Sequence, residues 1–149
     1  MPVPTLTLFS VSGSFPFQTK HLPLSTGTKV TLGSTEGPSG GARQPARVAA
    51  NNNGWFPPKH TGNSTVPPVS PLPLSSSHAE VWMDSGIVYI RDLESAFGTF
   101  VNGLRITQNT PLKTGDTITL GSRIPRNEKT PAYITDLHLS PVIIKVSLS

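Results

Sequence analysis

Hydrophobic and polar residues alternate in short runs through the middle of the chain, and each run ends at residues typical of a turn. In residues 79–83, Ala, Val and Met fall on one side of an extended segment, while Glu and Trp fall on the other. The sequence Asp-Ser-Gly at 84–86 can reverse the chain, and residues 87–91 are rich in β-branched and aromatic residues. The pattern predicts two core strands, at 79–83 and 87–91, joined by a tight turn.

A second hairpin and a further strand follow directly. Residues 100–101 lead into Asn102 and Gly103, the strongest short hairpin dipeptide, and residues 104–106 form the expected return strand. Another turn, at 115–116, precedes a core strand at 117–120. Three tight reversals so close together predict an antiparallel β meander.

The flanks of this stretch carry the same kind of pattern more loosely. Further strands are expected at residues 5–11, 28–32, 133–137 and 142–146. Residues 15–24 contain Pro16 and Pro23, so any strand there lies at a sheet edge or ends early. No long window sustains a helical period, so the fold class is all-β.

Between residues 35 and 73 the composition shifts to Gly, Pro, Ser and Asn. A structureless loop of this length would count against a compact domain, so we interpret it as an expanded loop inserted between two strands. Within it, Trp55 and Phe56 are expected to dock as an anchor, and residues 61–73 to behave as a mobile Pro-rich segment. We therefore expect residues 37–73 to be largely exposed and to lie outside the core.

The composition limits the class of protein. A chain of 149 residues has room for one domain and no second core. It has no cysteine, which excludes a disulfide framework and suits a reducing compartment. The N-terminus does not read as a signal peptide, and no run approaches the roughly 20 apolar residues of a membrane-spanning helix. We expect an intracellular protein, in the nucleus or the cytoplasm.

Charge and candidate chemistry exclude several functions. The net charge is +4, but only 13% of the residues are charged and the cations are scattered, which disfavours a nucleic-acid groove and suits a phosphorylated partner. Ser75, His78 and Asp92 could form a hydrolase triad, but Ser75 is not in a Gly-x-Ser-x-Gly elbow. The histidines show no metal-ligand spacing. We therefore predict no enzyme, no metal and no cofactor.

Three segments in the middle of the chain match a known family in order and spacing. They are SSSHAEVW, IRDLESAFGTFVNG and LKTGDTITLG. They resemble the pattern of the forkhead-associated (FHA) domain family: Ser-x-x-His, Asp-x-x-Ser-x-Asn-Gly-Thr, a second Asn-Gly, and Gly-Asp-x-Ile-x-Leu-Gly. The fungal members are similar also in the Asn-Gly-aromatic-Phe run found here at residues 53–56.

The resemblance implies a fold and a function. It implies a SMAD/FHA-type β-sandwich of about eleven strands, formed by a single domain at residues 1–149 with its inserted loop at about 35–73. The first and last strands would pair in parallel to close the sandwich. The family's loops at one end grip a phosphothreonine peptide, so the expected partner is a phosphorylated protein.

Several residues retain the family's pattern at this site. Ser75 matches the serine that donates to phosphate, and Ser76 occupies the next position, where the motif often has a second arginine. The resemblance gives His78, Gly98 and Thr99 a supporting role, with His78 holding the serine's segment in shape. Asn102 matches the second Asn-Gly, where it can bond the peptide backbone or shape the turn.

Other positions depart from the pattern. Ser34 stands where the family has its main phosphate-binding arginine, and Phe97 occupies the asparagine position of the Asn-Gly-Thr turn. Ala96 precedes it, at a position where the family also places a polar contact. Hydrogen bonds to a charged group contribute roughly 1.5–3 kcal/mol each, so losing an arginine fork would lower affinity by roughly two to four powers of ten. A cation from the inserted loop could substitute. The candidates are Arg43, Arg47, Lys59 and His60.

Two function classes remain open at this point. The first is an FHA module that reads phosphothreonine in signalling, with weakened or lost phosphate binding. The second is a domain that binds proteins independently of phosphorylation or serves as a scaffold, through Phe97, Trp82 or the Pro-rich loop.

Overall fold

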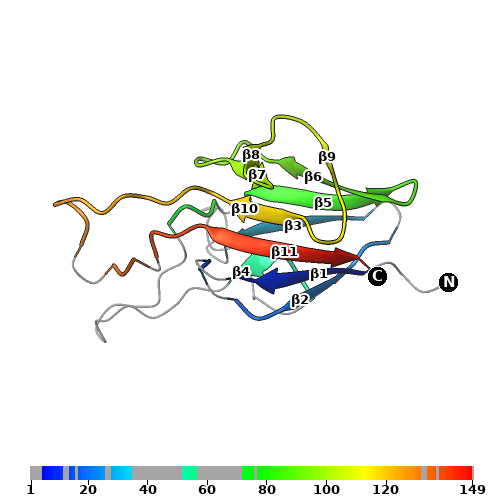
Figure 1. The fold of residues 1–149 in the computed structure, drawn as a ribbon, viewed down its shortest axis with the longest axis horizontal. Helices are drawn as coiled ribbons and strands as arrows, with labels where there is room; N and C mark the ends of the chain where they lie inside the picture. The colour runs from blue at the N-terminus through cyan, green and yellow to red at the C-terminus, as the bar shows by residue number, and fades with distance from the viewer. Residues whose placement is uncertain are drawn as a thin grey trace, which may run out of the picture.

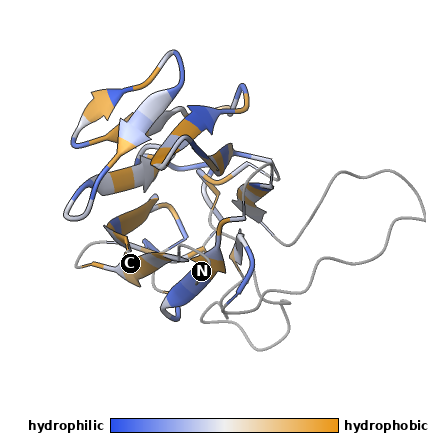
Figure 2. Ribbon diagram, turned by 90° about the vertical axis from the view of Figure 1, so that its right-hand side faces the viewer, coloured by the Kyte–Doolittle hydropathy of each residue, from blue (hydrophilic) through white to orange (hydrophobic). Residues whose placement is uncertain are grey.

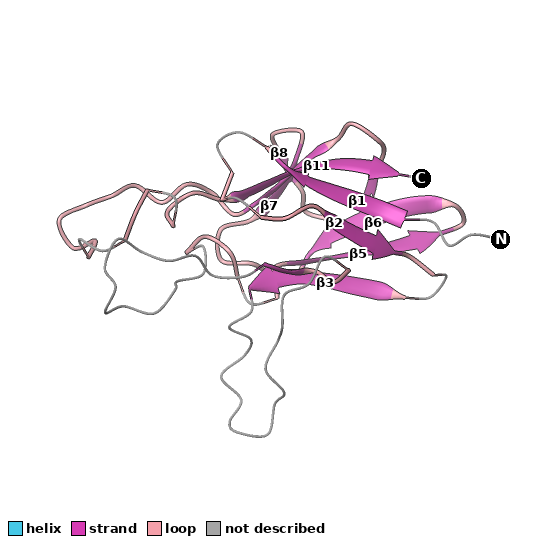
Figure 3. Cartoon of the chain, turned by 90° about the horizontal axis from the view of Figure 1, so that it is seen from below, coloured by secondary structure: helices cyan, strands magenta, loops and turns pink. Residues whose placement is uncertain are grey.

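The computed structural model describes residues 5–11, 14–15, 17–25, 28–34, 52–56, 72–75, 77–131, 134–136 and 138–148. This part of the chain consists of strands and loops, with no helix (Figures 1 and 3). The strands in chain order are β1 Thr5–Ser10, β2 Lys20–Pro23, β3 Lys29–Ser34, β4 Trp55–Phe56, β5 Ala79–Asp84, β6 Ile87–Asp92, β7 Thr99–Val101, β8 Leu104–Arg105, β9 Thr110–Leu112, β10 Thr117–Leu120 and β11 Val142–Leu148. The all-β prediction is confirmed.

The strands form two sheets that enclose one apolar core. The first sheet has the order β2-β1-β11-β10-β7-β8, and the second has the order β4-β3-β5-β6-β9. Buried residues alternate with less buried ones along β10 and β11, and Figure 2 shows hydrophobic and hydrophilic positions mixed along the strands. The fully buried side chains come from both sheets and include Leu8, Leu32, Val81, Ile90, Ile118 and Ile144. The described part of the chain is therefore the expected β-sandwich, with eleven strands.

The turn residues act as the sequence predicts. The β5–β6 turn has Ser85 and Gly86 at φ 53° and 82°, and the β7–β8 turn has Asn102 and Gly103 at φ 52° and 83°. Positive φ at both central residues is the geometry whose twist matches a two-residue hairpin. Both hairpins are confirmed.

The continuous meander, in contrast, is wrong. β5 and β6 belong to the second sheet, β7 and β8 belong to the first, and β9 returns to pair with β6. Both sheets bury an apolar face against the other, so the burial of a face does not decide which sheet a hairpin joins.

Two other expectations about strands also fail. β1 and β11 pair antiparallel, with Leu8 opposite Val146, and not in parallel. Alternation along a strand sets which side chains face the core, but not the direction of the neighbouring strand. In the predicted strand at 133–137, the described residues 134–136 form no strand, and the amide of Ile134 donates to the carbonyl of Pro131 in a turn.

Among its described residues, the inserted segment contributes Phe56 to the core. β4 pairs in parallel with the end of β3, Gly33 opposite Trp55. Phe56 is fully buried and meets Phe17 edge-on, with ring centres 5.0 Å apart. The docking of this pair agrees with the prediction, but the expectation that 37–73 lies outside the core is wrong at Phe56. The predicted mobile segment 61–73 lies mostly outside the described residues.

Candidate functional site

The end of β3 and the segment before β5 lie side by side. The Ser34 amide donates to the Ser75 carbonyl at 3.2 Å, and Ser34 is only 3% exposed. The loop after β10 runs beside the same segment, because the Leu72 amide donates to the carbonyl of His138. This loop extends from the end of the sandwich opposite the two termini (Figure 1). Ser34 and Ser75 are therefore brought together at that end.

His78 connects this segment to the turn before β7. The Ser75 amide donates to Nδ1 of His78 at 3.0 Å, so Nε2 carries the proton and donates to the Gly98 carbonyl at 2.8 Å. His78 is fully buried, and burial lowers the pKa of its imidazole although the Gly98 carbonyl and Asp92 oppose that effect. The neutral ring therefore fixes the distance between Ser75 and Gly98.

A second hydrogen-bonded cluster shapes the turn at residues 92–99. The Asp92 carboxylate accepts from the Ser95 amide at 3.1 Å, from the Ser95 hydroxyl at 2.5 Å and from the Thr99 hydroxyl at 2.6 Å. The Ser95 oxygen in turn accepts from the Gly98 amide at 3.0 Å. Burial raises the pKa of Asp92, but these hydrogen bonds lower it by more than burial raises it. The pKa of the carboxyl is therefore below its ordinary value.

The hydroxyl of Ser75 contacts this turn. Its oxygen accepts from the Ala96 amide at 3.1 Å, which leaves the hydroxyl hydrogen available to an acceptor from outside. The next residue, Phe97, is 38% exposed. The Phe97 carbonyl accepts from the hydroxyl of Ser122, in the loop after β10, at 2.9 Å. The turn thus presents a polar oxygen and an aromatic ring next to each other.

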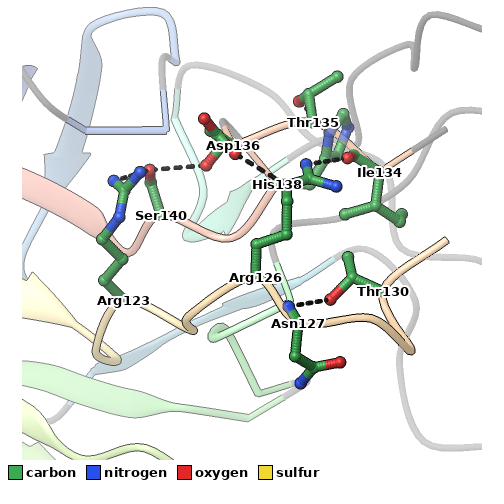
Figure 4. A network of polar contacts seen from close by, with 9 residues as sticks. All are labelled: Arg123, Arg126, Asn127, Thr130, Ile134, Thr135, Asp136, His138 and Ser140. Atoms are coloured by element: carbon green, nitrogen blue, oxygen red, sulfur yellow. Dashed lines mark hydrogen bonds and ion pairs between the residues drawn. The ribbon is translucent and has the colours of Figure 1, made fainter. Parts of the chain in front are cut away.

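The loop after β10 is braced from within (Figure 4). Arg123 donates to the Ser140 hydroxyl at 3.0 Å, and Arg126 pairs with Asp136 at 3.2 Å and donates to the carbonyl of Ile134. These contacts use the guanidinium groups of both arginines within the loop. The contact of this loop with the turn is the hydrogen bond from Ser122 to the Phe97 carbonyl.

The structure brings together four of the site residues expected from the sequence, with their supports, and separates one. Ser34, Ser75, Ala96 and Phe97 lie around the His78 imidazole and the turn that ends at Gly98 and Thr99. Ser76 and the candidate cations Arg43, Arg47, Lys59 and His60 lie outside the described residues. Asn102, at the far end of β7, accepts from the Thr117 amide at 2.9 Å and donates to Asp116 at 3.0 Å. Its contacts support the turn-shaping alternative.

Sequence reasoning missed two features of the site. It assigned no role to Ser95, and it considered Asp92 only as a member of a catalytic triad, which it rejected. The Asp-x-x-Ser spacing of the two residues could have indicated their hydrogen bonds. It also missed Arg105 on β8: a Cβ added to Gly98 would lie 2.9 Å from Arg105 Nε, so the guanidinium lies against this glycine. Arg105 also borders an open groove of about 500 Å³, together with Leu104, Ile106 and Lys113.

Comparisons with known proteins agree with this fold. An FHA domain family model matches residues 63–121. Vacuolar protein sorting-associated protein 64 of Saccharomyces cerevisiae is 45% identical over 80 residues, which is 50% of this chain and 13% of that protein. An uncharacterized protein of Schizosaccharomyces pombe is 42% identical over 76 residues, 42% of this chain and 25% of that protein. The chain thus spans a small part of both relatives.

Solved FHA domains show the same fold at low sequence identity. The FHA domain of an Arabidopsis thaliana protein superposes with a TM-score of 0.56 at 20% identity, covering 97% of this chain and 86% of that one. The N-terminal FHA domain of Rad53p from S. cerevisiae, solved with a phosphothreonine peptide, gives a TM-score of 0.52 at 15% identity, covering 97% and 94%. Sequence match and fold agree: residues 63–121 match the forkhead-associated domain family, the described strands form the β-sandwich that solved FHA domains share, and the two sequence relatives named above are fungal.

Proposed function

We propose that this FHA domain is a protein-interaction module that reads phosphothreonine in a partner protein through a weakened phosphate pocket. FHA domains are interaction modules and not enzymes. Rad53p, which shares the fold, binds a phosphothreonine peptide through its FHA domain. Here the Ser75 hydroxyl has a hydrogen to donate, beside a turn that the Asp92 cluster holds in shape.

The observation that carries the proposal is the environment of Ser34. It lies beside Ser75, where the family resemblance calls for an arginine, but it is a small, buried and uncharged side chain. A phosphate carries close to two negative charges, and a guanidinium fork is the side chain that compensates them best. Without it, affinity should fall by roughly two to four powers of ten.

A pull-down tests this proposal with a degenerate library of phosphothreonine peptides and the same library without phosphate. We expect a weak preference for the phosphorylated library, and its loss in Ser75→Ala. Ser85→Ala, in the exposed β5–β6 turn, is the matched control and should keep the preference. Equal capture of both libraries by the wild type would contradict phosphate reading.

A second candidate is binding that does not depend on phosphorylation, and the exposed ring of Phe97 favours it. The Ser122 hydroxyl holds the backbone beneath this ring, so the ring is presented at a fixed place. Trp82 is less available: it is half-buried, stacks on Tyr89 and has Lys29 Nζ 5.2 Å from its ring centre. Under this alternative, Phe97→Ala should weaken capture of an unphosphorylated partner, whereas Phe9→Ala, an exposed phenylalanine on β1, should not.

The proposal extends to the protein as a whole. We infer that residues 1–149 form a single domain with its inserted loop at about 35–73, acting inside the cell, where threonine kinases supply the phosphorylated partner. In the described part, no helix is long and apolar enough to cross a membrane. A fluorescent fusion of the full-length protein would show the compartment.

A further inference from the structure

Arg105 is an exposed cation without a partner in the described part of the chain. Among the arginines described, Arg91 pairs with Glu80, and Arg123 and Arg126 bond within their own loop. The Arg105 side chain makes no hydrogen bond or ion pair with any described residue. Its charge is therefore not compensated by this part of the domain.

The position of Arg105 is set by the β7–β8 hairpin and by Gly98. Arg105 pairs with Phe100, and the next amide, of Ile106, donates to the Thr99 carbonyl at 2.9 Å. This register folds the side chain back over Gly98, whose missing Cβ leaves room for the guanidinium. Any larger residue at position 98 would displace it.

Gly98 in turn lies next to Ser75. The Gly98 carbonyl and the Ser75 amide bond the two nitrogens of the same His78 ring, so only one imidazole separates them. Two donors at this place have no acceptor among the described residues: the Ser75 hydroxyl hydrogen and the Phe97 amide. A doubly charged anion bound here would contact these two donors. The guanidinium of Arg105, on its long side chain, could reach the same anion.

We propose that Arg105 binds the phosphate of the phosphothreonine, in place of the arginine that is missing at position 34. The inference rests on the proposed function, because it assigns the cation of the same pocket. A guanidinium is always charged and can donate two parallel hydrogen bonds to phosphate oxygens. An exposed side chain on a rigid hairpin can turn from Gly98 toward the anion without unfolding anything.

The test compares Arg105→Gln with Lys145→Gln, which removes the same charge from an exposed residue of β11. Binding of a phosphothreonine peptide and of its unphosphorylated copy is measured by calorimetry. Arg105→Gln should reduce the phosphate preference roughly tenfold or more, Arg105→Lys should keep part of it, and Lys145→Gln should leave it unchanged. An unchanged preference in Arg105→Gln overturns the inference and leaves the proposed function standing.

A restored pocket keeps the test decisive if wild-type binding is too weak to measure. In the double variant Ser34→Arg with Phe97→Asn, Arg105→Gln should again lower the phosphate preference. The Arg105 side-chain Nε–H signal, assigned by its loss in Arg105→Lys, should shift on adding phosphopeptide and not on adding plain peptide. If the signal does not shift, the inference is overturned and the proposed function still stands. Absence of phosphate-dependent binding in both backgrounds overturns it together with the proposed function.

Discussion

At the scale of single residues, the site depends on a neutral histidine that bridges two segments of backbone. His78 accepts from one backbone amide and donates to one carbonyl, and each of these partners belongs to a different segment. An uncharged, fully bonded ring is the form that burial favours, which agrees with its lowered pKa. Ser75 and Gly98 are therefore held in place by the same side chain.

Replacing His78 with alanine should destabilise the domain. His78→Ala leaves the Ser75 amide and the Gly98 carbonyl without this partner, at a cost of roughly 1–3 kcal/mol. Denaturant unfolding measures the loss, with His21→Ala, an exposed histidine on β2, as the control. If both variants unfold like the wild type, the ring does not support the site.

The lowered pKa of His78 also predicts a pH dependence. Below the ordinary histidine pKa of about 6.5, the unfolded chain binds a proton at this ring and the folded domain resists it, so stability falls as pH drops. The lowered pKa of Asp92 acts in a separate window, because its stabilisation is lost only as pH falls below about 3.9. Unfolding curves from pH 7 to 5 should show the first loss in the wild type and a smaller one in His78→Ala. An identical slope in both would contradict it.

At the scale of elements, turn chemistry is what the sequence predicts best. Asn102 and Gly103 specify their hairpin because both adopt the positive φ that few other residues tolerate. Strand partners are harder to predict, because alternation says which face is buried and not which sheet or direction completes it. The sheet to which β7 belongs and the direction in which β11 pairs with β1 were both predicted wrongly for this reason.

The candidate site was predictable to the extent that it lies in local motifs. Ser75, His78 and Gly98 come from spacings that match a family pattern, and the structure places them in contact through the His78 ring. Arg105 could not be found in this way, because its place over Gly98 depends on the pairing of β8 with β7. Its sequence position alone suggests only an exposed strand residue.

The turn role of Asn102 gives a prediction at this scale. Asn102→Ala removes bonds to Thr117 and Asp116 and places alanine at a positive φ, so it should cost roughly 1–3 kcal/mol. Peptide affinity per folded molecule should stay the same, because the amide is already used within the domain. Thermal unfolding and calorimetry on one sample separate the two effects. A lost affinity with unchanged stability would assign Asn102 to the peptide.

At the scale of the whole molecule, the described part of the inserted segment places one ring in the core of the sandwich. Phe56 closes the core beside Phe17 and aligns β4 with the end of β3, where Ser34 lies. The segment that interrupts the domain in sequence therefore also completes the sheet next to the site.

Removing the ring of Phe56 should lower the stability of the domain more than removing the ring of Trp55. Phe56→Ala leaves a cavity in the core and should destabilise the domain by about 3–5 kcal/mol, whereas Trp55→Ala, at a half-buried position, should cost less. Denaturant unfolding of the two variants checks the order. A larger loss in Trp55→Ala would show that the segment is anchored differently.

The central claim is that the domain retains the FHA scaffold but has a weakened phosphate pocket. Calorimetry with one phosphothreonine peptide and its plain copy tests it in wild type, Ser34→Arg, Ser34→Gln and Ser34→Arg with Phe97→Asn. The wild type should bind weakly, Ser34→Arg should gain part of the affinity, and the double variant should gain most, because it adds both the guanidinium fork and a backbone-reading amide. Ser34→Gln, of similar length without charge, should gain nothing. Tight wild-type binding that Ser34→Arg does not improve would contradict the account.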